Sequence, residues 1–322
     1  MICKRTILLT VVLFGVAAQA QQFKPPQNRN AALRYWIAFA ELQDRPADEA
    51  TTKLIESVLA GDAAWDEQRL GPMIDQNDAA LRIMQRGTSL PECNWGLEYE
   101  RGGAMSLAHL PKARALARLN ALYGARLLYK GDSAGAVAAW IAGLRFAQHM
   151  NEGISLIGVL SAKPGFMADL RFLTKAVQSG VLSNELLEKV RATLRTIPQD
   201  GLNWSSAVNF EAWADESELK KFVETKNFDE LFRSSFSRDP GPATQPTASD
   251  LAKFHAVMNE VVAAFQLPSA QTKDRLEQIQ ITVKQLDAAS QAITPNYLRT
   301  NEARRQVAAE REVLEKALAN AK

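Results

Sequence analysis

The sequence predicts an all-α protein. Apolar residues recur at helical spacing along most of the chain, alternating strand patterns are almost absent, and short breaks rich in glycine or proline separate the periodic segments. The 322-residue chain has 47% hydrophobic residues, enough for one large core or two smaller ones. We therefore expect an irregular array of antiparallel helical hairpins, either tetratricopeptide-like or a helical bundle, after a cleaved signal peptide.

The first 20 residues have the three-part pattern of a secretory signal peptide. Lys4 and Arg5 precede an apolar run that starts at Ile7, and Ala18-Gln19-Ala20 forms a small-x-small cleavage site. The apolar run is about a dozen residues, whereas a transmembrane helix needs roughly 20. The pattern predicts a periplasmic or secreted protein that begins at Gln21 and has no transmembrane anchor after cleavage.

Cleavage would change both the charge balance and the cysteine content. Removing Lys4 and Arg5 from the 38 basic residues leaves 36, equal to the 36 acidic residues. A net charge of zero argues against nucleic acid or an anionic membrane as a partner. Cys93 becomes the only cysteine, so no internal disulfide can form and stability must come from the apolar core.

Changes in composition divide the mature chain into two predicted parts. Residues 21–200 form a predicted helical-hairpin domain, and residues 201–322 form a C-terminal helical segment with a proline-rich loop at 238–247. In the first part, we expect a helix from Pro72 to about Arg86 and a kink or break near Pro164.

Three apolar stripes predict long amphipathic helices after the proline-rich loop. The spacing is typical of helices packed on the body, because it does not persist for enough heptads to form a free coiled coil. The stripes consist of Leu251, Phe254, Met258, Val261 and Phe265; of Leu276, Ile279, Val283 and Leu286; and of Val307, Leu314 and Leu318.

One segment, residues 117–148, resembles a single tetratricopeptide repeat. Gly124 is followed after seven residues by Gly131-Asp132, then by Ala136 and by Trp140. In that family the first small residue lets two helices approach, the Gly-Asp pair turns the chain, and the alanine lies where the helices are closest. The segment departs from the repeat pattern at Asn120, Tyr123 and Gln148, and no second copy occurs at the same period.

The histidines do not form a known metal motif. His109, His149 and His255 lie in different segments, and the usual zinc and calcium signatures are missing, so we expect no metal and no cofactor. His149 and Glu152 lie near one helix end and are candidates for an acid–base pair or two ligands. The alternative is a helix terminus capped by a protonated histidine.

The loop at residues 92–101 has the most unusual composition in the chain. Its carboxylates are weak candidates for general acid–base catalysis, and its rings and arginine are candidates for ligand binding. Cys93 is either a nucleophile assisted by His109 or a small buried hydrophobic residue. The alternative for the whole loop is that its rings pack on the helices while its charges stay in water. The catalytic candidates are Glu92, Glu98 and Glu100, and the binding candidates are Trp95, Tyr99 and Arg101.

The lack of catalytic patterns favours a binding protein over an enzyme. There is no phosphate-binding loop and no G-x-S-x-G elbow, and stacked helices commonly present a concave face to proteins or peptides. We expect an exported scaffold or binding module of the cell envelope whose partner is a protein or peptide. The alternative is an envelope hydrolase or lyase, which would need two loop carboxylates to converge in a deep pocket.

Overall fold

A computed structural model describes residues 28–43, 47–152, 155–236, 239 and 244–321. This part contains 14 α-helices and no strand, which confirms the predicted all-α class. The predicted signal peptide, its cleavage site and part of the proline-rich loop lie outside the described residues.

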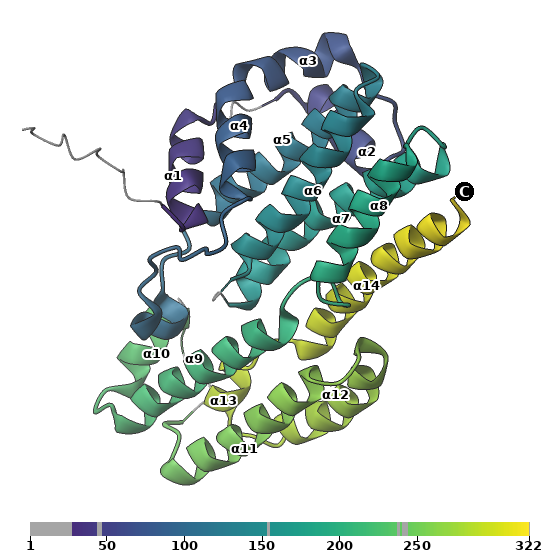
Figure 1. Cartoon of the computed structure of the whole chain (residues 1–322). Helices are drawn as coiled ribbons and strands as arrows, with labels where there is room; N and C mark the ends of the chain where they lie inside the picture. Colours follow the sequence, from purple (N-terminus) through teal and green to yellow (C-terminus); the bar gives the residue numbers. More distant parts are fainter. Residues whose placement is uncertain (1–27, 44–46, 153–154, 237–238, 240–243, 322) are drawn as a thin grey trace, which may run out of the picture.

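The first half of the chain forms the upper body in Figure 1. Its core is built around α5, α6 and α7, which pack on one another. Its elements are α1 (Ala31–Glu41), α2 (Glu49–Ala60), α3 (Glu67–Gln76), α4 (Asp78–Gly87), α5 (Leu110–Tyr129), α6 (Ser133–Met150), α7 (Leu156–Gln178) and α8 (Asn184–Thr196). The 3-10 turn η1 (Tyr99–Ala104) belongs to the same half of the chain but packs against α9 (Trp204–Glu224) in the lower body (Figure 1).

The second half forms the lower body, except for its last helix, which runs back along α7 (Figure 1). The predicted C-terminal helices are confirmed as α11, α12 and α14. The elements are α9 (Trp204–Glu224), α10 (Phe228–Phe236), α11 (Ala248–Phe265), α12 (Ser269–Val283), α13 (Ala288–Ile293) and α14 (Tyr297–Asn320). No helix in the described ranges has the length and apolar character needed to cross a bilayer.

The turn between α5 and α6 brings two helices into close contact. Gly131 has a φ of 83°, a left-handed conformation that favours glycine, and the Asp132 carboxylate accepts a hydrogen bond from Gly135 N at 2.8 Å. Further along, Trp140 donates from Nε1 to the Ala121 carbonyl at 3.1 Å, and a side chain at Gly124 would collide with its indole. Glycine at position 124 is therefore required by the close approach of the helices.

A carboxyl group is buried where α5, α6 and α7 meet. Asp169 is 1% exposed, and neither of its carboxyl oxygens has a hydrogen-bond partner within the described structure. Gly143 leaves the space that this carboxyl group occupies, since a Cβ there would overlap it. Burial raises the pKa of Asp169 well above its ordinary value, which favours the neutral acid.

Helix α14 connects the two bodies through arginine side chains. Arg304 donates to Asp200 at 2.8 Å and to the Leu267 carbonyl at 2.8 Å, while Arg311 donates to the Leu194 carbonyl at 3.0 Å. These carbonyls lie at or near the C-terminal ends of α8 and α11, where helices leave acceptors unpaired. Residues on both sides of the predicted boundary at 200 therefore share one core.

One expectation about prolines was wrong, and a second was wrong in part. α3 begins at Glu67, after an Asp66 cap that accepts from Arg69 N at 3.0 Å, so Pro72 lies inside the helix and not at its first position. α7 continues through Pro164 without a break. Proline in a helix interior costs about 3 kcal/mol, but the packing of α7 against α5, α6 and α14 outweighs that loss.

Candidate functional site

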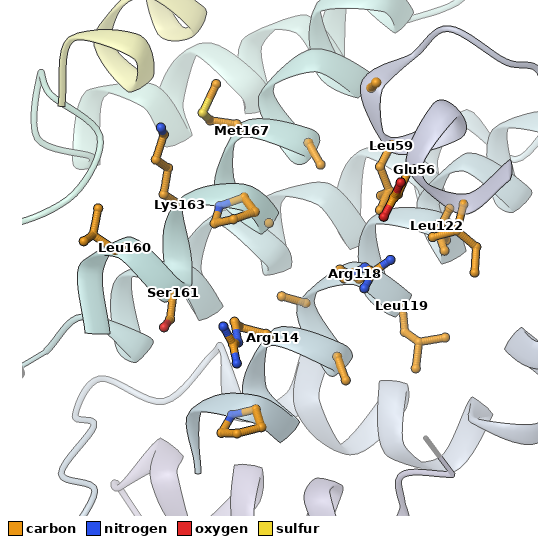
Figure 2. A pocket seen from close by; sticks show the side chains of 18 of the residues that line it. Glu56, Leu59, Arg114, Arg118, Leu119, Leu122, Leu160, Ser161, Lys163 and Met167 are labelled. Carbon is orange, nitrogen blue, oxygen red and sulfur yellow. The ribbon is translucent and has the colours of Figure 1, made fainter. Parts of the chain in front are cut away.

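A groove of about 1540 Å³ runs between α2, α5 and α7 and reaches the start of α14 (Figure 2). Each helix contributes one face, because the lining residues follow the spacing of helical turns. On α5 the lining extends from Pro111 to Leu122, and on α7 it extends from Leu156 to Arg171. Three segments that are distant in the sequence thus form one concave surface.

Small residues form the floor of the groove, where α5 meets α7. A Cβ added at Gly165 would lie 2.9 Å from the Cβ of Ala117, so the two backbones approach closely at this point. Larger side chains, including Leu59, Leu119 and Leu160, line the walls. The combination of small floor residues and large wall residues gives the groove its depth.

Five basic and two acidic side chains line the groove, so its charge is predominantly positive. The basic residues are Arg114, Arg118, Lys163, Arg171 and Arg299, and the acidic residues are Glu56 and Glu211. Figure 2 shows Arg114 and Arg118 on α5, Lys163 on α7 and Glu56 on α2.

Only some of the basic side chains have partners within the protein. Arg171 forms an ion pair with Glu310 at 2.7 Å, and Lys163 donates to Gln306 at 2.5 Å. Arg114, Arg118 and Arg299 form no ion pair with any residue that the structure describes. These three guanidinium groups are available to a ligand with negative charges.

Two carboxyl groups one helical turn apart lie on α9, and one of them reaches the groove. Glu211 lines the groove and accepts a hydrogen bond from Leu156 N, at the start of α7, at 3.1 Å. Burial, followed by the nearby Glu211 charge, raises the pKa of Asp215 to about 9. Burial also raises the pKa of Glu211. At neutral pH Asp215 therefore holds its proton.

The predicted catalytic carboxylates of the 92–101 loop do not converge. Glu92 is exposed and pairs with Arg29 at 2.7 Å, and Glu98 is exposed and pairs with Arg101 at 2.7 Å. Glu100 is also exposed, and none of the three lines the groove. The arrangement lacks the convergence that a pair of catalytic acids would require.

The predicted binding residues of the loop differ in their surroundings. The Trp95 indole is buried and donates from Nε1 to the His149 carbonyl at 2.8 Å, so it packs on the helical body. Tyr99 is half-buried, with its ring centroid 6.2 Å from that of Phe210, and Arg101 is exposed. These three side chains do not line the groove.

His149 belongs to an aromatic cluster at the end of α6. Its Nδ1 lies 2.6 Å from the Tyr35 hydroxyl, and burial lowers its pKa to about 4. It is thus neutral near pH 7, unlike the protonated histidine that the capping interpretation requires. Glu152 lies beyond the end of the helix and is exposed.

The Cys93 thiol is not activated as a nucleophile. Burial raises its pKa to about 12, so the reactive thiolate is scarce at neutral pH.

His109 lies in the same cluster and is 1% exposed. It stacks on Trp95 with ring centroids 4.5 Å apart, and neither ring nitrogen has a hydrogen-bond partner in the described structure. Burial lowers its pKa to about 4. Within the described ranges, no group of three or more His, Cys, Asp or Glu residues could hold a metal ion.

Sequence reasoning missed the residues of the groove. Arg114 and Arg118 are four residues apart on an apolar helix, a spacing that places two cations on one face. That pattern could have identified them, but it is equally typical of a solvated helix surface.

Comparison with protein-family models, curated proteins and solved structures found no match to this chain. Its fold and site define it as an all-α protein with an apolar groove that carries unpaired arginines.

Proposed function

We propose that the protein is an exported binding module of the cell envelope, which holds a segment of a partner protein or a peptide in the groove between α2, α5 and α7. The observation that carries this proposal is a deep, mainly apolar groove with three arginines that have no ion pair among the described residues. Ligand sites are usually concave and apolar, with a few polar groups that orient the ligand.

The proposal includes the finer description of the fold. The contacts between α5 and α6 support an irregular array of antiparallel helical hairpins that is tetratricopeptide-like around residues 117–148, since α6 approaches α5 closely at Gly124, as expected of the first small residue of that repeat. Export is proposed from the pattern of the first 20 residues. N-terminal sequencing of the protein from an envelope fraction should give Gln21 as the first residue, and an intact Met1 would contradict export with cleavage.

The exposure of the loop carboxylates favours the binding module over the enzyme alternative. A hydrolase or lyase based on Glu92, Glu98 or Glu100 needs a shared pocket, but these side chains lie in solvent and two of them pair with arginines. We therefore propose no reaction for this loop.

Site-specific photocrosslinking in intact cells tests whether the groove holds a partner. A photoreactive phenylalanine analogue is introduced at Leu160, which lines the groove and is 42% exposed. The matched control is Val313 on α14, which is 47% exposed and does not line the groove. A discrete protein adduct that forms from position 160 and not from position 313 is the expected result. Equal adducts at both positions, or none at position 160, would contradict the proposal.

A further inference from the structure

We infer that the ligand of the groove is an acidic amphipathic α-helix of about four turns, with carboxylates spaced one turn apart. This inference rests on the proposed function, and it specifies the chemistry of the partner segment that the groove holds. The argument uses the length of the groove, the position of its cations and its exposed apolar side chains.

The length of the groove fits a short helix. Its lining on α7 runs from Leu156 to Arg171, a rise of about 22 Å at 1.5 Å per residue. A helix of roughly 15 residues has the same length. Helices that bind in grooves insert one apolar face between the walls, which is the shape that α2, α5 and α7 offer.

The unpaired cations lie at helical spacing. Arg114 and Arg118 are one turn apart, about 6 Å along α5, and both are exposed. Carboxylates four residues apart on a ligand helix would have a similar separation and could pair with both guanidinium groups. Arg299, at the start of α14, supplies a third unpaired cation within the described residues.

The spread of positive charge favours an acidic peptide over an anionic lipid. A lipid carries its charge at one end and needs an apolar channel for its chains. Here the unpaired arginines lie on α5 and at the start of α14, and Lys163 adds a cation on α7. A chain with charges along its length complements this distribution.

Exposed apolar residues at the groove supply the hydrophobic part of the contact. Ile157 is 57% exposed and Leu160 is 42% exposed, and both line the groove. Burying them against an apolar helix face would remove nonpolar surface from water, while the arginines select for negative charge.

The test is selection of 16-residue peptides from a random display library on the purified full-length protein. The expected pool is enriched in Asp and Glu four residues apart, with Leu, Ile or Phe on the opposite face. The strongest selected peptide, measured by fluorescence anisotropy, should lose at least about tenfold in affinity with an R114E/R118E double variant. The R114Q/R118Q variant, which has no reversed charge, should weaken binding less and in the same direction.

The R86E variant is the matched control. Arg86 is an exposed arginine on α4 that does not line the groove, so its reversal should leave the affinity unchanged. Thermal melts of all variants establish that they remain folded. Binding should also weaken as salt is raised from 0.05 M to 0.5 M, because the arginines are exposed.

The inference would be overturned by a selected pool without acidic enrichment, by equal affinity for the R114E/R118E and R86E variants, or by displacement of the peptide by vesicles of anionic phosphatidylglycerol. A neutral or basic partner crosslinked at position 160 would leave the proposed function intact while refuting the acidic helix. Selection of acidic peptides in vitro, without a crosslinked adduct at position 160 in cells, would support the acidic ligand chemistry while contradicting the proposed function in the cell envelope.

Discussion

Gly124 on α5 lies directly against the indole ring of Trp140 on α6. The ring is fully buried, and its Nε1 donates to the Ala121 carbonyl at 3.1 Å. The absence of a side chain at position 124 thus sets the distance between these two helices.

Substituting Gly124 by alanine should destabilise the protein. The added methyl group would overlap the Trp140 ring, and overpacking of a core typically costs 1–3 kcal/mol. Urea denaturation followed by circular dichroism measures the change. The control is G103A, because nothing lies within 4 Å of a Cβ at Gly103. Equal stability of the two variants would show that the helices separate without cost.

Substituting Asp169 by asparagine should stabilise the protein near neutral pH. The folded pKa is raised above the ordinary value of 3.8, so folding retains a proton that the unfolded chain releases. The contribution of this proton to the free energy of unfolding is fully present below pH 3.8 and is lost as the pH rises toward the raised pKa of the folded state. Asparagine is uncharged at every pH, so D169N should gain roughly 1–3 kcal/mol at pH 7. A free energy of unfolding that is unchanged at pH 7 would contradict the burial of a titrating acid.

Substituting His109 by phenylalanine should remove a loss of stability in acid. The folded pKa of about 4 is below the ordinary 6.5, so the unfolded chain binds a proton first as the pH falls. Stability is present above pH 6.5 and is lost between pH 6.5 and pH 4, by up to about 3 kcal/mol. The phenylalanine in H109F supplies an aromatic ring that can stack on Trp95, and the substitution removes no hydrogen bond because neither nitrogen of His109 has a partner in the described structure. Denaturation at pH 7 and pH 4.5 should show a smaller difference for H109F than for the wild type.

Substituting Arg304 by methionine should destabilise the protein strongly. Its side chain is 5% exposed and pairs with Asp200, and its loss leaves that carboxylate without its donor. Breaking one partner of a buried ion pair costs about 3–5 kcal/mol. The R305M variant removes a neighbouring arginine whose pair with Glu302 is exposed, and it should change the free energy of unfolding by less than about 1 kcal/mol. A similar effect of both variants would mean that Arg304 does not stabilise this junction.

The helical class was predictable because it depends on local periodicity. The stripes at Phe254 and Val307 each repeat within one segment, so the sequence alone indicated α11 and α14. The course of α7 was not predictable in the same way. Pro164 is a strong local signal for a break, and contacts with distant helices override it.

The groove was not predictable for a related reason. Its walls come from α2, α5 and α7. No pattern within any one of these segments indicates that the three helices lie close together. Arg114 and Arg118 look like solvated charges until α7 contributes Leu160 and Lys163 to the same groove. The loop around Cys93 attracted attention by its composition, yet Trp95 and Cys93 are buried in the body and the loop carboxylates are in water.

The arginines of α14 also constrain the order in which the chain can fold. A chain made from its N-terminus completes α8 and Asp200 before the donors Arg304 and Arg311 exist. Until residues 297–320 arrive, Asp200 lacks the Arg304 guanidinium with which it pairs, and the side of α7 that packs against α14 is uncovered. We therefore expect a chain that ends at residue 296 to bind the dye ANS and to unfold without a sharp transition, whereas cooperative unfolding of that chain would show that the first body closes on its own.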